Sequence, residues 1–227
     1  TDNGPSILSK QMSKSGTIGV DKVWPARFLV PLQSLLPNDH FVLGSDCVDN
    51  ARACKDAEEQ RLMKEASHIN DSCIQKGFAF VKKGITEKEV AAYIDAQFVA
   101  EGAECPSFET IVSFGANAAD PHHSPDNTIV QEGDCVLIDM GCKKNRYCSD
   151  MTRTNFFHNA PQQFAAIHDL VRSANEAAEA MIHPGVRFCD IDKTARDIIS
   201  SAGYGEYFTH RLGHFIGQSD HEQGDVS

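Results

Sequence analysis

No stretch of this 227-residue sequence stays apolar over the roughly 18 residues that a membrane-spanning helix needs. The first residues also lack the charged head and apolar middle of a signal peptide. Basic residues are in the minority, with 21 Lys and Arg against 32 Asp and Glu, which gives a formal net charge of -11. Because nucleic acids and most membrane surfaces are negative, we expect neither as a partner.

Paired cysteines are absent as well, since the eight cysteines form no C-x-x-C motif. In an acidic chain without an export signal, we expect most of them to be reduced core residues rather than a disulfide framework. Hydrophobic residues make up 41% of the chain, which is enough for a packed core and excludes global disorder. We therefore expect a cytoplasmic enzyme.

Residues 1–55 read as a small α/β fragment. Short apolar runs predict strands at 17–20 and 40–43, and an apolar face at helical spacing predicts a helix over 25–36. A strand-helix-strand unit of this size cannot bury both faces of its sheet. We expect more of this domain upstream of Thr1.

Two long helices are predicted next, because each start carries an N-cap residue followed three positions later by Glu. Asp56 with Glu59 starts the first helix, and Thr86 with Glu89 starts the second. Gly102 stops the second helix.

Strands and then helices follow. The patterns predict strands at 110–114, 135–138 and 146–157, a helix that starts at Pro161, and a helix over 190–201. The order helix, helix, strands, helix, helix indicates an α+β domain over 56–227 that is built from a duplicated helix-helix-strand unit, with a shorter second copy.

Two carboxylates are the most informative residues. With Lys144-Asn145 as a two-residue hairpin turn, Asp139 would lie directly opposite Asp150. Opposed like charges near a buried strand repel each other, so the pair needs a proton or a metal ion. The alternative is a shifted register that leaves both side chains in solvent.

Histidines cluster in two segments, and their presence favours a metal site at the two carboxylates over a solvent-exposed pair. His122 and His123 lie in a loop with two prolines, and His210, His214 and His221 fall within twelve residues. Carboxylate oxygens with an imidazole suit divalent ions such as Mn, Co or Zn. Two such ions, about 3.5–4 Å apart, would activate a water for hydrolysis.

Three motifs carry a resemblance to a known family: VLIDMG at 136–141, SDMTRT at 149–154 and HRLGH at 210–214. The chain resembles the pita-bread metallopeptidases and is most similar to their aminopeptidase P and prolidase branch. The match covers 56–227, and 1–55 is similar to the end of the creatinase-like N-terminal domain of those enzymes.

The resemblance implies a metal centre. Asp139, Asp150 and His214 would be ligands of two divalent ions, Mn first and Co or Zn as alternatives, with Asp150 bridging the ions. Two further Glu ligands are expected beyond Ser227. Phe215 stands where the family more often has Gly, and we expect it to narrow the pocket beside His214.

The resemblance also implies roles for three histidines. His122 would handle a proton or the leaving group, and His221 would stabilise the tetrahedral intermediate. His210 would line the substrate side. Arg153 favours the prolidase and aminopeptidase P branch over methionine aminopeptidases.

The implied reaction is hydrolysis of the peptide bond before proline by a metal-bound hydroxide, as in an Xaa-Pro aminopeptidase. The alternatives are an Xaa-Pro dipeptidase, creatinase-like chemistry that uses His as acid and base without metal, and a non-catalytic interaction domain. Asp139 and Asp150 argue against the creatinase-like alternative. We expect proline-containing peptide substrates, a homodimer when the protein is intact, and no activity from the printed 227 residues alone.

Overall fold

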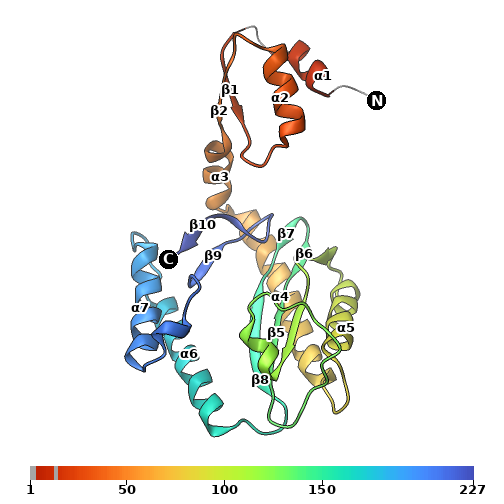
Figure 1. Cartoon of the computed structure of the whole chain (residues 1–227), viewed down its shortest axis with the longest axis vertical. Coiled ribbons are helices and arrows are strands. Elements are labelled where there is room, and N and C mark those ends of the chain that lie inside the picture. The colour runs from red at the N-terminus through yellow and green to blue at the C-terminus, as the bar shows by residue number, and fades with distance from the viewer. Residues whose placement is uncertain (1–3, 13–14) are drawn as a thin grey trace. The chain divides into compact units, whose positions relative to one another are not determined.

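The structure is a computed structural model that describes residues 4–12 and 15–227. The contacts within the chain define two compact units, Thr1–Cys54 and Lys55–Ser227 (Figure 1). Each unit is described by itself. None of the helices in the described ranges is long and apolar enough to cross a membrane.

The first unit holds a two-stranded parallel sheet with helices. Its elements are α1 (Gly4–Gln11), β1 (Thr17–Val20), α2 (Ala26–Leu35), β2 (His40–Leu43) and α3 (Ser45–Ala53). The strands β1 and β2 pair in parallel, with Thr17 opposite His40, and α2 makes the crossover that a parallel pair requires. The predicted strand-helix-strand order is confirmed, whereas α1 and α3 were not expected.

The second unit opens with α4 (Ala57–Phe80) and α5 (Glu87–Ala100), and both helices begin where their capping residues predict. The Asp56 carboxylate accepts the Glu59 N–H at 2.9 Å, and the Glu59 carboxylate accepts the Asp56 N–H at 2.7 Å. Thr86 caps α5 with the same reciprocal pattern. These bonds satisfy N–H groups that a helix leaves unpaired at its start.

The two helices pack against antiparallel strands (Figure 1). One sheet has the order β4-β5-β8, formed by β4 (Ile111–Phe114), β5 (Cys135–Met140) and β8 (Met151–Phe156). The other has the order β3-β6-β7, formed by β3 (Cys105–Pro106), β6 (Cys142–Lys144) and β7 (Tyr147–Cys148). Helix and sheet side chains share one core, in which Ile94, Phe98 and Ile138 are fully buried.

The hairpin register differs from the expectation. The turn lies at Asn145–Arg146, where both residues have positive φ (49° and 71°), and not at Lys144–Asn145. Asp139 therefore pairs with Thr152, and the direct pairing of Asp139 with Asp150 is wrong. Two consecutive positive φ values suit a two-residue hairpin turn, but the Arg gives no sequence signal for one of them.

The strand expected over 146–157 is divided into β7 and β8, with Ser149 and Asp150 between them. The Ser149 hydroxyl accepts the Cys142 N–H at 3.1 Å, and so takes the place of a ladder bond. Asp150 thus lies where the strand pairing is interrupted. Its side chain need not follow the alternation between the two sheet faces that a regular strand imposes.

The helix-helix-strand order then repeats with α6 (Gln162–Ala180), α7 (Phe188–Ser201), β9 (Gly213–Phe215) and β10 (Glu222–Val226). Helix α7 begins two residues earlier than predicted, and the antiparallel hairpin of β9 and β10 was not resolved from the sequence. A smaller core joins the helices to each other, and its buried members are Ala174, Ala178, Ile191, Ala195 and Ile199.

All eight cysteines, which lie in the described residues, are free thiols. The expected absence of a disulfide framework is therefore confirmed. The expected burial of most of them is wrong, because only Cys73, Cys142 and Cys148 are buried. Burial raises the pKa of each of these three thiols and keeps it protonated.

Candidate metal centre

One pocket of about 560 Å³ gathers the residues that the sequence singled out. Strand β5, the gap before β8, the loop before β5 and the segment around β9 all contribute to its wall. The predicted site residues that line it are His122, Asp139, Asp150, His210, His214 and His221. Segments far apart in the sequence thus converge on one cavity.

Asp139 and Asp150 form the acidic floor of this pocket. Burial, together with the negative charge of Asp220, raises the pKa of Asp139, although the Thr152 hydroxyl donates to its carboxylate at 2.8 Å. Burial, and then the charges of Asp139 and Asp220, raise the pKa of Asp150 to about 6. Nearby negative charge thus disfavours the ionised forms of Asp139 and Asp150, and a proton or a cation would relieve this repulsion.

His214 on β9 directs its Nε2 nitrogen at Asp150. Its Nε2 lies 3.2 Å from a carboxylate oxygen of Asp150, and the two side chains are 18% and 26% exposed. Its Nδ1 lies 3.1 Å from the Phe215 carbonyl oxygen, which can only accept a hydrogen bond. Nδ1 is therefore the donor in this hydrogen bond, which is the arrangement of a histidine that binds a metal through its other nitrogen, Nε2.

His221 lies against His214, with ring centroids 3.9 Å apart. Its Nδ1 is hydrogen-bonded to one Asp220 oxygen at 2.7 Å. The other Asp220 oxygen is buried and has no hydrogen-bond partner among the described residues. Asp220 was missed by the sequence reasoning, and its position directly before a predicted site histidine was the available signal.

His122 and His210 occupy the exposed wall of the pocket. The imidazole of His210 bonds to the Arg211 carbonyl at 2.9 Å, and the backbone N–H of His122 donates to Asp120 at 3.0 Å. Phe215 does not line the pocket but packs edge-to-face on Phe188 at 5.3 Å, so the expected narrowing beside His214 is wrong.

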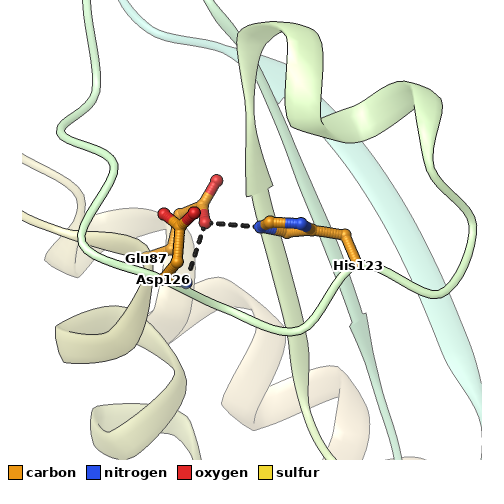
Figure 2. A group of neighbouring side chains, drawn as sticks. All are labelled: Glu87, His123 and Asp126. Carbon is orange, nitrogen blue, oxygen red and sulfur yellow. Dashed lines mark hydrogen bonds and ion pairs between the residues drawn. The ribbon is translucent and has the colours of Figure 1, made fainter.

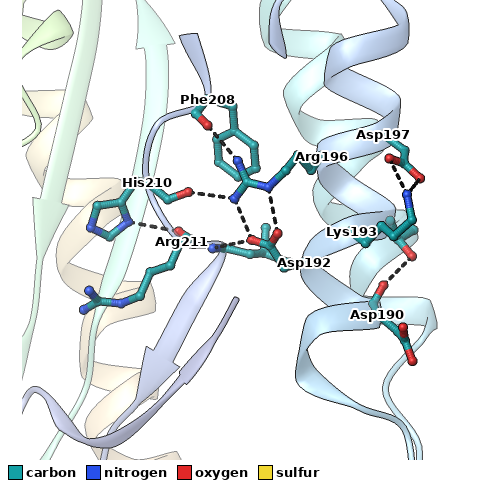
Figure 3. Close-up of polar contacts among 10 residues, drawn as sticks. Asp190, Asp192, Lys193, Arg196, Asp197, Phe208, His210 and Arg211 are labelled. Carbon is teal, nitrogen blue, oxygen red and sulfur yellow. Dashed lines mark hydrogen bonds and ion pairs between the residues drawn. The ribbon is translucent and has the colours of Figure 1, made fainter. Parts of the chain in front are cut away.

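A partly buried ion pair holds the segment that leads into β9 (Figure 3). Arg196 makes two 2.8 Å bonds to Asp192 on α7, and its guanidinium also donates to the carbonyls of Phe208 and His210 at 2.7 and 3.1 Å. The same Asp192 accepts the Leu212 N–H at 3.1 Å. Helix α7 thus fixes the backbone just before the metal-facing histidine.

A second group of possible ligands lies on another side of the loop that carries His122. Atoms of Glu87, His123 and Asp126 that can bind a metal lie within 4.8 Å of one another (Figure 2). The sequence reasoning missed Glu87, because an acidic residue in the first turn of a helix is common without any site.

Solved structures of similar fold are peptidases. The prolidase from Pyrococcus furiosus matches 99% of this chain with a TM-score of 0.93 and 30% identity, and the match covers 66% of that chain. The X-Pro aminopeptidase from Thermotoga maritima matches 98% of this chain with a TM-score of 0.88 and 30% identity, over 64% of its own length. The predicted pita-bread α+β fold is confirmed.

Similar sequences agree with the fold. A putative dipeptidase of Bacillus subtilis is 41% identical over 187 residues, which cover 82% of this chain and 52% of that protein. An uncharacterized peptidase of Staphylococcus epidermidis is 40% identical over 189 residues, or 83% of this chain and 54% of that protein. The chain spans about half the length of these relatives.

The model of metallopeptidase family M24 matches residues 61–227. This chain belongs to metallopeptidase family M24.

Proposed function

We propose that the protein is a divalent-metal-dependent peptidase that cleaves the bond before proline, in the manner of an Xaa-Pro aminopeptidase. The observation that carries the proposal is the convergence of Asp139, Asp150 and His214 on the pocket that also holds His122 and His221. Membership of a metallopeptidase family supports the chemistry, and the prolidase and X-Pro aminopeptidase folds support the substrate.

The donor set fits a divalent cation. Partial burial, together with nearby negative charge, raises the pKa values of Asp139 and Asp150, and His214 directs its Nε2 nitrogen at Asp150. A cation would relieve this repulsion, and such an ion would supply a nucleophile at neutral pH and polarise the scissile carbonyl. We propose two ions, Mn first, completed by two further Glu ligands outside the printed sequence.

Other side chains of the pocket would handle the substrate. We assign His122 to the proton that the leaving prolyl nitrogen needs, and His221 to a hydrogen bond with the oxyanion. Asp220 holds the His221 ring through Nδ1, which keeps the imidazole in one orientation. His210 lies on the substrate side of the pocket.

The pocket wall suits a proline side chain. Phe108, Ile111 and Leu212 contribute apolar surface next to the carboxylates, and a pyrrolidine ring is apolar and rigid. An Xaa-Pro dipeptidase is the second candidate, because a relative in Bacillus subtilis is described as a putative dipeptidase. We keep as proposals a creatinase-like origin for residues 1–55 and a homodimeric intact protein.

Peptide hydrolysis by the full-length protein tests the proposal. Purified protein with added Mn²⁺ is assayed on matched Xaa-Pro, Xaa-Pro-Yaa and Xaa-Ala-Yaa peptides. We expect release of the first residue from Xaa-Pro-Yaa and little from Xaa-Ala-Yaa. Cleavage of Xaa-Pro alone would select the dipeptidase, and metal-independent cleavage or none at all would refute the proposed function.

A further inference from the structure

The carboxylate of Glu87 does not line the pocket and is not among the proposed metal ligands. Glu87 is the first residue of α5, and its side chain is completely buried. Figure 2 shows the Glu87 carboxylate meeting His123, which comes from the loop between β4 and β5. A buried ionised side chain is costly unless it is fully hydrogen-bonded, so its partners are informative.

Four donors from one stretch of chain surround the Glu87 carboxylate. Oε1 accepts the Phe114 N–H at 2.7 Å and the Asn117 side-chain amide at 2.9 Å. Oε2 lies 2.7 Å from Nε2 of His123 and accepts the Asp126 N–H at 3.1 Å. A carboxylate has about four acceptor positions, and all of them are filled.

The hydrogen bonds leave no acceptor position of the Glu87 carboxylate open to a cation, although the three ligand types are present. An ionised carboxylate can only accept, so Nε2 of His123 carries the proton and has no lone pair for a metal. The Asp126 carboxylate is also engaged, since it accepts the Thr128 N–H at 2.6 Å. The group is a hydrogen-bonded anchor.

The anchored stretch contains His122. The four donors of Glu87 come from residues 114–126, so a single carboxylate fastens the loop before and after His122. His123, the next residue along the chain, supplies the contact to Glu87 on one side of His122. Both histidines line the pocket, and the Glu87–His123 contact ties the residue next to His122 to helix α5.

We propose that Glu87 is a positioning residue that holds His122 at the pocket through His123. The neighbouring histidines thereby have different roles. His123 anchors the loop, and the His122 side chain remains available to the substrate. The inference rests on the proposed function for the chemistry of His122, and on the contacts above for the anchor itself.

Backbone bonds limit the reach of this anchor. The first turn of α5 bonds to the end of the loop, with Lys88 N–H to the Asp126 carbonyl and Glu87 N–H to the Thr128 carbonyl, both at 3.2 Å. These bonds do not involve the Glu87 side chain. Loss of the carboxylate should therefore release residues 115–125 and leave 126–130 in place.

Hydrogen exchange of the full-length, Mn²⁺-loaded protein tests the anchor. In Glu87→Gln, the new amide group faces donors, and we expect exchange over 115–125 to rise about 10- to 100-fold, the factor for one hydrogen bond to a charged group. Glu132→Gln is the matched control, because Glu132 makes the same 2.7 Å contact to His158 but both side chains are about 60% exposed. Unchanged exchange over 115–125 in Glu87→Gln, or an equal rise in α4 and β5, would overturn the proposal.

Kinetics separate positioning from general stability. We expect Glu87→Gln to lower kcat by about 10- to 100-fold with unchanged KM and metal content. His123→Gln, whose amide can still donate to Glu87, should keep more activity than His123→Ala. His122→Ala should lower turnover without changing loop exchange. Equal activity of the two His123 variants would contradict the proposal that His123 positions His122 through its contact with Glu87.

The two arms fail separately. A wild-type protein that cleaves no proline peptide refutes the proposed function, while loop exchange still decides whether Glu87 is the anchor. If Glu87→Gln does not fold, His123→Ala takes its place in the exchange experiment, with a rise over 115–125 expected and no rise contradicting the proposal.

Discussion

The two helix-helix-strand repeats of Lys55–Ser227 contribute residues to the same site, but they differ in structure. The first repeat has a large core and two three-stranded sheets, and it supplies Asp139 and Asp150. The second repeat has a small core and a two-stranded hairpin, and it supplies His214 and His221. The carboxylates therefore lie on the better-packed side, and the histidines depend more on local polar contacts.

Each repeat uses one acidic side chain from its second helix to fix a chain segment beside the pocket. Glu87 on α5 binds two backbone N–H groups and a histidine, and Asp192 on α7 binds one backbone N–H and Arg196. The first anchor is fully buried, and the second is partly open to solvent on its Arg196 side. Both sides of the cavity therefore hold a chain segment by a polar anchor, and the anchor on the better-packed side is the more buried of the two.

The largest effect is expected from Asp150→Asn, which removes charge while keeping shape. We expect metal and turnover to be lost together, beyond the roughly 10²–10⁴-fold cost of removing a general acid or base. Metal analysis and peptide hydrolysis check it. Asp71→Asn, at an exposed aspartate 3.6 Å from His68, is the control. Full metal content and turnover in Asp150→Asn would contradict the bridging role.

His122→Ala and His221→Ala test one histidine from each repeat. We expect kcat to fall about 10²–10⁴-fold in each, since both are assigned to proton handling or hydrogen bonding rather than to the metal. Metal content should remain unchanged. His158→Ala, at an exposed surface pair, should keep full turnover. Loss of the ions from His122→Ala would move that residue into the ligand set.

Acid stability should distinguish the acidic groups of the two repeats. Asp150 has a folded pKa of about 6 in the metal-free protein, against 3.8 ordinarily, so the folded state binds its proton more tightly. This stabilisation is complete below about pH 4 and is lost as the pH rises through 6. The pKa of Asp192 is lowered, first of all by the Arg196 hydrogen bond, so its contribution is lost as the pH falls below about 4.

Denaturant unfolding of the metal-free protein between pH 4 and 7 measures the contribution of Asp150. We expect wild type to lose stability relative to Asp150→Asn as the pH rises from 4 to 7. Saturating Mn²⁺ should abolish this loss. A wild-type protein whose stability rises relative to Asp150→Asn from pH 4 to 7 without metal would show the opposite sign and refute the assignment.

The smallest effect is expected from Arg196→Ala, which removes the anchor of the second repeat. We expect the free energy of unfolding to fall by about 1–3 kcal/mol, because Asp192 loses its partner. Arg187→Ala is a matched control, since Arg187 makes the same two-bond contact to Asp190 but is exposed, and a clearly smaller loss is expected. Equal losses in the two variants would show that the second repeat does not depend on this anchor.

Local signals predicted most of the fold. The capping residues Asp56 and Thr86 start their helices where expected, because capping involves neighbours only three positions apart. The hairpin register was wrong because it depends on positive φ at Arg146, which the residue type does not announce. The family motifs, rather than the register, brought Asp139 and Asp150 to the same pocket.

The site beyond the motifs could not be predicted, because its members meet through tertiary contacts. Glu87 lies 36 residues from His123, and Asp192 lies 20 residues from Leu212. Neither separation follows a helical or strand period. Asp220 was adjacent to a named histidine, but only the fold shows that its charge reaches Asp139 and Asp150.

Anomalous diffraction from crystals of the intact protein grown with Mn²⁺ tests the central claim most directly. The account predicts anomalous density in contact with the Asp139 and Asp150 carboxylates and Nε2 of His214, and none at Glu87 and His123. Density at Glu87 and His123, or no density beside Asp150 at saturating Mn²⁺, would contradict it.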